Sequence, residues 1–295
     1  MVFNGILPAP PFQGAPCGLF SVARVVDHST DAHWVAGFDV ETDSFPTISL
    51  RNNADQGIAG PEAVIYDGTG KPKSYLATPF FVELRAHATN IDFIREGDGE
   101  FKATIKAQIK AASQKAVERE LWEGVATRNA DTPEAQKALF LRRPTADGGA
   151  TVVTSAGATP EKALWLIEQA ISSSPTGGRG TIHMTRDVAS ALGSRLRYFE
   201  KNEIDEKTYA VTRLGTKVVI GSGYTGAGPV GATGTAASAT NKWIYVTGDV
   251  TVDLGKPQLV QWDTPSINDH EALISLAGAV HFDPSLFAAA QVTLP

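Results

Sequence analysis

The first part of the chain has a pattern that predicts neither a helix nor a central strand. Prolines recur near the start of residues 1–40, and each one fixes φ and removes a backbone donor; they are Pro8, Pro10, Pro11 and Pro16. Apolar residues such as Leu19 and Phe20 accompany them, too many for a free disordered tail. We expect residues 1–40 to form an extended arm that packs on its own body or on a neighbouring chain.

Residues 41–78 alternate short β-like runs with turn signals. Thr47–Leu50 and Ala63–Tyr66 are predicted strands, and the sequence Asp-Gly-Thr-Gly at Asp67–Gly70 is a predicted turn. The pattern indicates a long, polar, two-stranded ribbon with almost no core-forming residues. Because isolated ribbons are only marginally stable in water, we expect this one to pack against another subunit.

A strand and a long helix dominate the predicted unit at residues 79–158. The strand is Phe80–Leu84, and the helix covers 101–127. Alanine occupies part of the helix's apolar stripe, which includes Ile105, Ile109, Ala112 and Ala116. A narrow stripe of this kind favours a helix that lies across a surface and is not enclosed by a core.

From Thr159 the pattern becomes α/β. Thr159, Pro160 and Glu161 combine an N-cap, a proline at the first helical position and an acid in the first turn, which predicts a helix to about Ser173. The following predictions are a strand at Gly180–Met184, a helix capped by Thr185 that reaches about Arg197, and a strand at Lys217–Ile220.

The last part of the pattern combines a glycine-rich loop with predicted strands. Gly, Ala, Thr and Ser dominate residues 221–240, which predicts a loop. Trp243–Thr247 and Val250–Leu254 are predicted to form a hairpin turned at Gly248 and Asp249. Closing strands are expected at Leu273–Phe282 and Phe287–Leu294. The resulting units are 159–258 and a return segment, 259–295.

Composition narrows the possible classes of protein. The chain has 295 residues, 42% of them hydrophobic and 20% charged, as in an ordinary globular protein with one large domain or two intertwined ones. A net charge of −6 makes it a poor candidate for a dedicated nucleic-acid binder. No apolar run approaches the roughly 20 residues that a membrane-spanning helix needs, so no membrane partner is expected. Cys17 is the only cysteine, which excludes an intrachain disulfide and favours folding in a reducing cytoplasm.

The sharpest candidate for a binding site is the run Gly-Ser-Gly-Tyr-Thr-Gly at Gly221–Gly226. It matches the glycine pattern of dinucleotide-binding folds and follows a predicted strand. No helix is predicted after it, because Ala227–Gly231 continues the loop, and Asp249 downstream is assigned to a turn. We therefore favour a flexible loop over a nucleotide site.

Two further clusters invite a functional interpretation. Within a short stretch, a metal ion has four possible ligands: Asp27, His28, Asp31 and His33. Nothing fixes these residues on one face, so a solvated polar cluster is favoured. Lys102, Lys106 and Lys110 form a basic line suited to DNA or an acidic scaffold. Since Glu118, Glu120 and Glu123 dilute this charge further along, we favour a solvated helix face.

No constellation of catalytic residues is predicted. The sequence has no Gly-x-Ser-x-Gly elbow, and Cys17 lies in the proline-rich arm. Glu118 and Glu120, two residues apart on a helix, point to different faces and do not form an acid–base pair. We expect no enzyme activity, no cofactor and no catalytic, cofactor-binding or metal residue.

The order of the elements resembles the major capsid protein of tailed bacteriophages, whose Hong Kong-type capsid fold also occurs in encapsulin shells. The resemblance spans nearly the whole chain, and its specific parts look like those from phages of actinobacterial hosts. They are Phe80–Leu84 followed by Lys115–Gly124, then Gly178–Met184, then Arg213–Val219 with Trp243–Leu254.

The resemblance implies an α+β fold with named parts. These are an N-terminal arm (1–40), an extended loop (41–78), a peripheral domain (79–158) with a spine helix (101–127), an axial domain (159–258) and return strands of the peripheral domain (259–295). It also implies a homo-oligomer of hexamers and pentamers that encloses DNA in a virion. Such shells form in the host bacterial cytoplasm, with scaffolding and portal proteins as partners.

Several alternatives stay open at the level of sequence. They are an encapsulin-like compartment, a nucleotide-binding enzyme that uses the 221–226 loop, and a minor virion protein. Some capsids of this fold cross-link a loop lysine to a neighbour's asparagine, and Lys71 and Lys73 lie near the expected loop tip. No asparagine partner is identified, so no cross-link is predicted. The sequence shows no scaffold-like extension before the arm, which leads us to expect a separate scaffolding protein.

Overall fold

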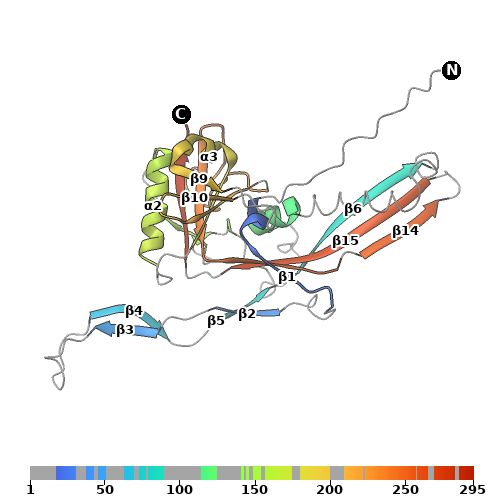
Figure 1. The fold of residues 1–295 in the computed structure, drawn as a ribbon, viewed down its shortest axis with the longest axis horizontal. Helices are drawn as coiled ribbons and strands as arrows, with labels where there is room; N and C mark the ends of the chain where they lie inside the picture. Colours follow the sequence, from blue (N-terminus) through green and yellow to red (C-terminus); the bar gives the residue numbers. More distant parts are fainter. Residues whose placement is uncertain are drawn as a thin grey trace.

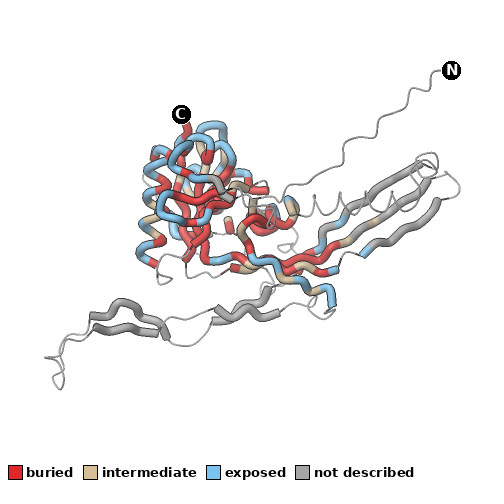
Figure 2. The backbone as a smooth tube through the Cα atoms, in the orientation of Figure 1, coloured by how far each residue is buried: buried red, intermediate tan, exposed pale blue. Residues whose placement is uncertain are grey.

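The computed structural model has an α+β fold built on two main sheets and two paired ribbons (Figure 1). It describes residues 18–30, 38–42, 46–50, 63–69, 73–77, 79–89, 114–124, 141–142, 144–145, 149–153, 157–174, 180–199, 209–221, 223–256, 258–264, 269–282 and 286–295. Figure 2 shows that buried residues gather in the compact part of the molecule that contains the larger sheet, and along the adjoining part of the smaller sheet.

The larger sheet has seven strands in the order β7-β16-β12-β8-β11-β10-β9. Their bounds are β7 Thr151–Val152, β8 Thr181–Met184, β9 Leu196–Phe199, β10 Tyr209–Thr212, β11 Lys217–Ile220, β12 Asn241–Thr247 and β16 Phe287–Thr293. Helices α2 (Pro160–Ser172) and α3 (Arg186–Leu192) accompany it. As predicted, Thr159 caps α2: its side chain accepts a hydrogen bond from the Lys162 amide, and Pro160 is the first helical residue.

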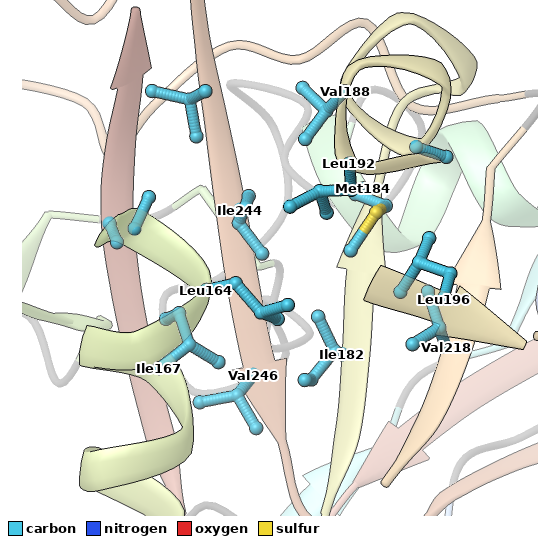
Figure 3. Close-up of a cluster of buried hydrophobic side chains, with 14 of the residues drawn as sticks. Leu164, Ile167, Ile182, Met184, Val188, Leu192, Leu196, Val218, Ile244 and Val246 are labelled. Atoms are coloured by element: carbon cyan, nitrogen blue, oxygen red, sulfur yellow. The ribbon is translucent and has the colours of Figure 1, made fainter. Parts of the chain in front are cut away.

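The main core lies between these helices and the larger sheet. Leu164 and Ile167 of α2 are buried with Ile244 and Val246 of β12 (Figure 3). Val188 and Leu192 of α3 join the same cluster, together with Met184 at the end of β8. Each helix therefore has one apolar face, and burial of that face against the sheet holds it in place.

The smaller sheet has five strands, and the long strand β15 (Asp269–Phe282) organises it. The other members are β1 Arg24–Asp27, β6 Phe80–Thr89, β13 Val250–Leu254 and β14 Gln258–Thr264. β15 pairs antiparallel with β6, β13 and β14, and β1 adds a parallel pairing to β13. The strand expected at Phe80–Leu84 is thus confirmed and extends to Thr89.

The ribbons consist of two strand pairs that belong to neither main sheet, although β5 contacts β15 of the smaller one (Figure 1). β2 (Phe38–Thr42) pairs with β5 (Lys73–Ala77), and β3 (Pro46–Leu50) pairs with β4 (Ala63–Thr69). The predicted strands are confirmed, but the predicted turn at Asp67–Gly70 is wrong, because β4 continues to Thr69. Register shifts in the β3–β4 pairing show an irregular, bulged ribbon, which tolerates a glycine within a strand.

The predicted hairpin at Gly248 and Asp249 is also wrong. Both strands exist, but β12 pairs with β8 and β16 in the larger sheet, whereas β13 pairs with β1 and β15 in the smaller one. Gly248 and Asp249 therefore carry the chain from one sheet to the other. The sequence pattern of two apolar runs joined by a short polar link does not distinguish the two cases. The runs can pair with each other, as in a hairpin, or with distant strands, as they do here.

Three further predictions differ from the structure. Two concern helix ends, which lie at glycines with positive φ, and the third concerns the last strand. α3 ends at Leu192, not near Arg197, because Gly193 has φ +45° and a 3-10 turn leads into β9. The described part of the 101–127 helix, residues 114–123, ends before Gly124, which has φ +58°. The final strand β16 pairs with β12, so residues 259–295 do not return as one unit to the smaller sheet.

The described part of the arm packs on its own chain. A 3-10 turn, η1 (Gly18–Ser21), buries Leu19 and Phe20, and β1 then pairs with β13. Gly18 is needed for this close approach, since a Cβ there would lie 2.3 Å from the Ile220 carbonyl oxygen. Residues 1–17, including Cys17, lie outside the described part.

Candidate functional site

The glycine-rich run packs against the helix formed by residues 114–123. The Gly223 amide donates a hydrogen bond to Glu118 Oε2 at 2.7 Å, and Glu118 is 1% exposed. A Cβ on Gly223 would lie 2.7 Å from both the Lys115 oxygen and the Arg119 nitrogen. A Cβ on Gly221 would lie 2.5 Å from Glu118 Oε1. The glycines allow the backbone to approach the helix closely, and their amide binds a carboxylate of the same chain.

An aromatic cluster lies beside this contact. Trp122 stacks on Tyr224 with ring centroids 4.0 Å apart, and it meets Tyr245 edge-on at 4.9 Å. The Tyr224 hydroxyl lies 2.8 Å from the Trp243 carbonyl oxygen. Burial, together with the neighbouring Tyr245, raises the pKa of Tyr224 well above 10, and burial likewise raises the pKa of Tyr245. Both phenols remain protonated and act as packing groups and hydrogen-bond donors.

His183 completes the cluster from strand β8. Its ring is 1% exposed, meets Trp122 edge-on at 5.4 Å, and has Nε2 2.9 Å from Thr247 Oγ1. Because the Thr247 hydroxyl donates to the Gly248 carbonyl, its oxygen is available to accept the His183 Nε2 proton. Burial lowers the pKa of His183 to about 3, so the ring is neutral near pH 7.

Arg142 joins the end of the helix to the glycine-rich loop. Its guanidinium pairs with Glu123, and its Nε donates to the Gly228 carbonyl at 3.0 Å. The Gly228 backbone packs directly against the Trp243 side chain, because a Cβ on Gly228 would lie 2.3 Å from the indole ring. We call the contacts of the helix 114–123 with residues 221–229, β8 and β12 the junction. It fixes the helix on the larger sheet through polar and aromatic contacts.

A second polar cluster fastens the arm. Asp253 on β13 is 3% exposed and lies between two histidines. Its Oδ1 is 2.7 Å from His28 Nε2, just after β1, and its Oδ2 is 2.9 Å from His281 Nδ1 on β15. This group, the Asp253 cluster, joins three strands of the smaller sheet.

The described residues do not form the candidate binding sites that the sequence suggested. No helix follows Gly226, so the strand–helix context of a dinucleotide site is missing, and a carboxylate occupies the Gly223 amide. The run is a loop, as predicted, but residues 223–229 are mostly buried, so the loop packs against the helix and is not exposed to solvent. Asp27 accepts from the Ser29 amide, and His28 contacts Asp253; Asp31 and His33 lie outside the described residues.

The expectation that the long helix lies across a surface is wrong for its described part. Val117, Leu121 and Trp122 are buried, and so are Glu118 and Glu120. The carboxylates looked like a solvated face in the sequence, but Glu118 has a loop amide as its partner. The lysines at 102, 106 and 110 lie outside the described residues. Within the described part, no group of three or more His, Cys, Asp or Glu side chains is arranged to hold a metal ion, and no helix is long and apolar enough to cross a membrane.

Comparison with known proteins places the fold. No protein family and no curated protein matches the sequence. Among solved structures, the capsid of an empty GTA particle is similar with a TM-score of 0.59 at 12% identity, covering 100% of this chain and 95% of that one. A structure from Mycobacterium phage Cain has a TM-score of 0.55 at 12% identity, covering 96% and 89%. The SrpI encapsulin of Synechococcus elongatus has a TM-score of 0.53 at 10% identity, covering 97% and 91%.

These similarities define the class of architecture. The chain has the Hong Kong-type capsid fold, which phage capsids and encapsulins share, and the similarity covers the whole chain. The fold expected from the order of the elements is confirmed.

Proposed function

We propose that this chain is the major capsid protein of a tailed bacteriophage, a structural subunit and not an enzyme. Copies assemble as hexamers and pentamers into an icosahedral shell that encloses double-stranded DNA without sequence-specific contacts. Assembly occurs in the host bacterial cytoplasm, with scaffolding and portal proteins as partners. Residues 1–40 act as the arm, 41–78 as the extended loop, and the larger sheet with α2 and α3 as the axial part.

The observation that carries the proposal is the extent of the structural similarity. Shell subunits match 96% to 100% of this chain, so the ribbons and the arm are included as well as the compact core. The ribbon strands pair only with each other among the described residues, and ribbons of this kind gain stability when a neighbour buries them. A net charge of −6 also suits a wall that surrounds DNA without adhering to it.

An encapsulin-like compartment is the second candidate, supported by the similarity to the SrpI shell. The two kinds of shell differ in what they enclose, since a capsid holds DNA and a compartment holds enzyme cargo. The nucleotide-binding alternative loses its support, because the loop that would cradle a phosphate faces the Glu118 carboxylate, which would repel it.

Negative-stain electron microscopy tests the proposal. The chain is expressed alone and together with its neighbouring phage genes, and we expect shells, hexamers or pentamers in at least one sample. A monodisperse monomer in both samples at every concentration would contradict the shell function. Nuclease-protected DNA in particles made during infection separates a capsid from a cargo compartment. Uniform full-size shells from the chain alone would contradict the need for a separate scaffolding protein.

A further inference from the structure

One side of α2 borders an open groove. The groove is about 410 Å³, whereas a water molecule occupies roughly 30 Å³ of the liquid, so it has room for a side chain. Apolar walls come from Leu166 and Ala170 of α2, from Val153 just after β7, and from Leu286 and Ala288 at the start of β16. Ser173 and Ser174 line the end at the helix C-terminus.

An exposed leucine, Leu214, lies beside the opposite side of α2, and we call its side chain the knob. Leu214 lies in the turn between β10 and β11 and is 79% exposed, more than any other exposed large hydrophobic residue in the described part. Glu168 fixes this turn, since it accepts hydrogen bonds from the Thr212 and Thr216 hydroxyls at 2.5 and 2.9 Å. Leu214 is therefore presented on a rigid turn, which lowers the entropic cost of burying it in a contact.

The knob and the groove face away from each other. Residues on a helix advance about 100° each, so Leu166 and Ala170 project roughly 160° away from Glu168. Strand register also places both features at one end of the sheet. Lys217 on β11 follows the turn and pairs with Thr181 on β8. Thr181 pairs with Thr247 on β12, and Thr247 pairs with Phe287 on β16, beside the groove. A contact from one copy's knob to the next copy's groove would therefore run head to tail, the arrangement that closes into rings.

Charge complements the apolar fit. Arg213, beside Leu214, is exposed and positive. The groove ends at the C-terminus of α2, where helix carbonyls present partial negative charge and the last turn has no basic residue. The two surfaces thus match in both polarity and charge.

We propose that Leu214 of one copy inserts into the groove between α2 and β7 of the next copy, forming the repeated contact within a ring of subunits. This inference rests on the proposed shell function and names the surfaces that would make its rings. The occupant of the groove is a second copy of this chain, because the same chain carries the complementary knob.

Cysteine pairing tests the contact directly. In a Cys17→Ser background, Leu214→Cys with Ala170→Cys is expected to give a ladder of disulfide-linked multimers when assembled particles are oxidised. The two positions lie on opposite sides of α2, which disfavours a bond within one copy. The matched control combines Leu214→Cys with Ser190→Cys, an exposed site on α3, and should give no ladder. Particles that form normally but give no ladder, or a bond from position 170 to a different virion protein, would overturn the proposal.

Assembly assays provide the second measurement. Leu214→Asp and the groove-filling Ala170→Trp are each expected to raise the protein concentration needed for assembly at least tenfold. Val230→Asp, at another exposed apolar residue, should leave it unchanged. Circular dichroism melts verify that each variant folds. If both variants fold and assemble like wild type, this inference fails while the shell function stands; if wild type never assembles, both fail.

Discussion

At the scale of single residues, His183 makes the fold sensitive to acid. The ring is buried in the junction and its pKa is lowered from 6.5 to about 3 by burial, so the folded state keeps it neutral. In the unfolded chain the ring takes up a proton as the pH falls below 6.5. Its contribution is therefore fully present above pH 6.5 and is lost progressively as the pH falls toward 3.

Replacement of His183 tests this effect. Each pH unit within the window corresponds to roughly 1.4 kcal/mol, so wild type should lose roughly 3 kcal/mol between pH 6.5 and 4 from this residue alone. His183→Gln removes the titrating group and should lose correspondingly less over the same range. Urea unfolding at a series of pH values measures the difference. Parallel profiles for the two proteins would show that His183 is not the responsible group.

Gly223 is a second residue with a sharp prediction. Gly223→Ala places a Cβ 2.7 Å from helix backbone atoms, which cannot move as a side chain does. We expect a loss of about 1–3 kcal/mol in the free energy of unfolding. Gly278→Ala is the matched control, because its Cβ would meet neighbours only at 3.5 Å or more. Thermal denaturation of both variants gives the comparison, and equal melting temperatures would contradict the close-packing role.

Local chemistry in the sequence revealed some of these residues and concealed others. The cap formed by Thr159 and Pro160 was predictable, because an N-cap depends on residues within one turn. The burial of Glu118 was not, because its partner amide is 105 positions away along the chain. The glycines at 221–226 were recognised as a pattern, but the helix they approach is not adjacent in sequence.

At the scale of elements, strand β1 depends on the Asp253 cluster. Among the described strands β1 pairs with β13 alone, so much of its described attachment comes from that pairing and from the His28–Asp253 contact. Removal of a hydrogen-bonded charged partner typically costs about 1.5–3 kcal/mol.

Asp253→Ala is expected to release β1 locally. Hydrogen exchange of residues 24–27 should accelerate by roughly tenfold or more, since about 1.4 kcal/mol is tenfold in an equilibrium constant. Asp249→Ala, an exposed carboxylate at the start of the same strand, is the control and should leave exchange unchanged. If exchange rises equally in both variants, the cluster does not hold the arm.

Strand partners were beyond the reach of the sequence even where it located the strands. Alternating apolar residues located β12 and β13 correctly, yet the two strands enter different sheets. The same holds for β16, which joins β12 and not the neighbouring β15. Periodicity reports that one face of a strand is buried, and it carries no information on which distant strand completes the ladder.

At the scale of the whole molecule, we expect the β3–β4 ribbon to serve assembly more than the stability of the isolated subunit. Replacement of residues 43–72 by a short Gly-Ser linker removes β3 and β4, which form a two-stranded sheet of their own in the described part of the chain. We expect the thermal melt of the remaining subunit to change little and shells to disappear in electron micrographs. A large drop in melting temperature would show that the ribbons stabilise the monomer, and normal shells would remove them from assembly.

The path of the chain through β15 and β16 has a consequence during synthesis. β15 joins β6, β13 and β14 in one sheet, and β16 lies between β7 and β12 in the other, so neither sheet has all its described strands until β15 and β16 have been synthesised. Long-range pairings of this kind form late and slowly. A polypeptide that stops before residue 269 lacks both β15 and β16, and so lacks a strand that each sheet needs. We therefore expect polypeptides that stop before β15 to be excluded from assembled particles.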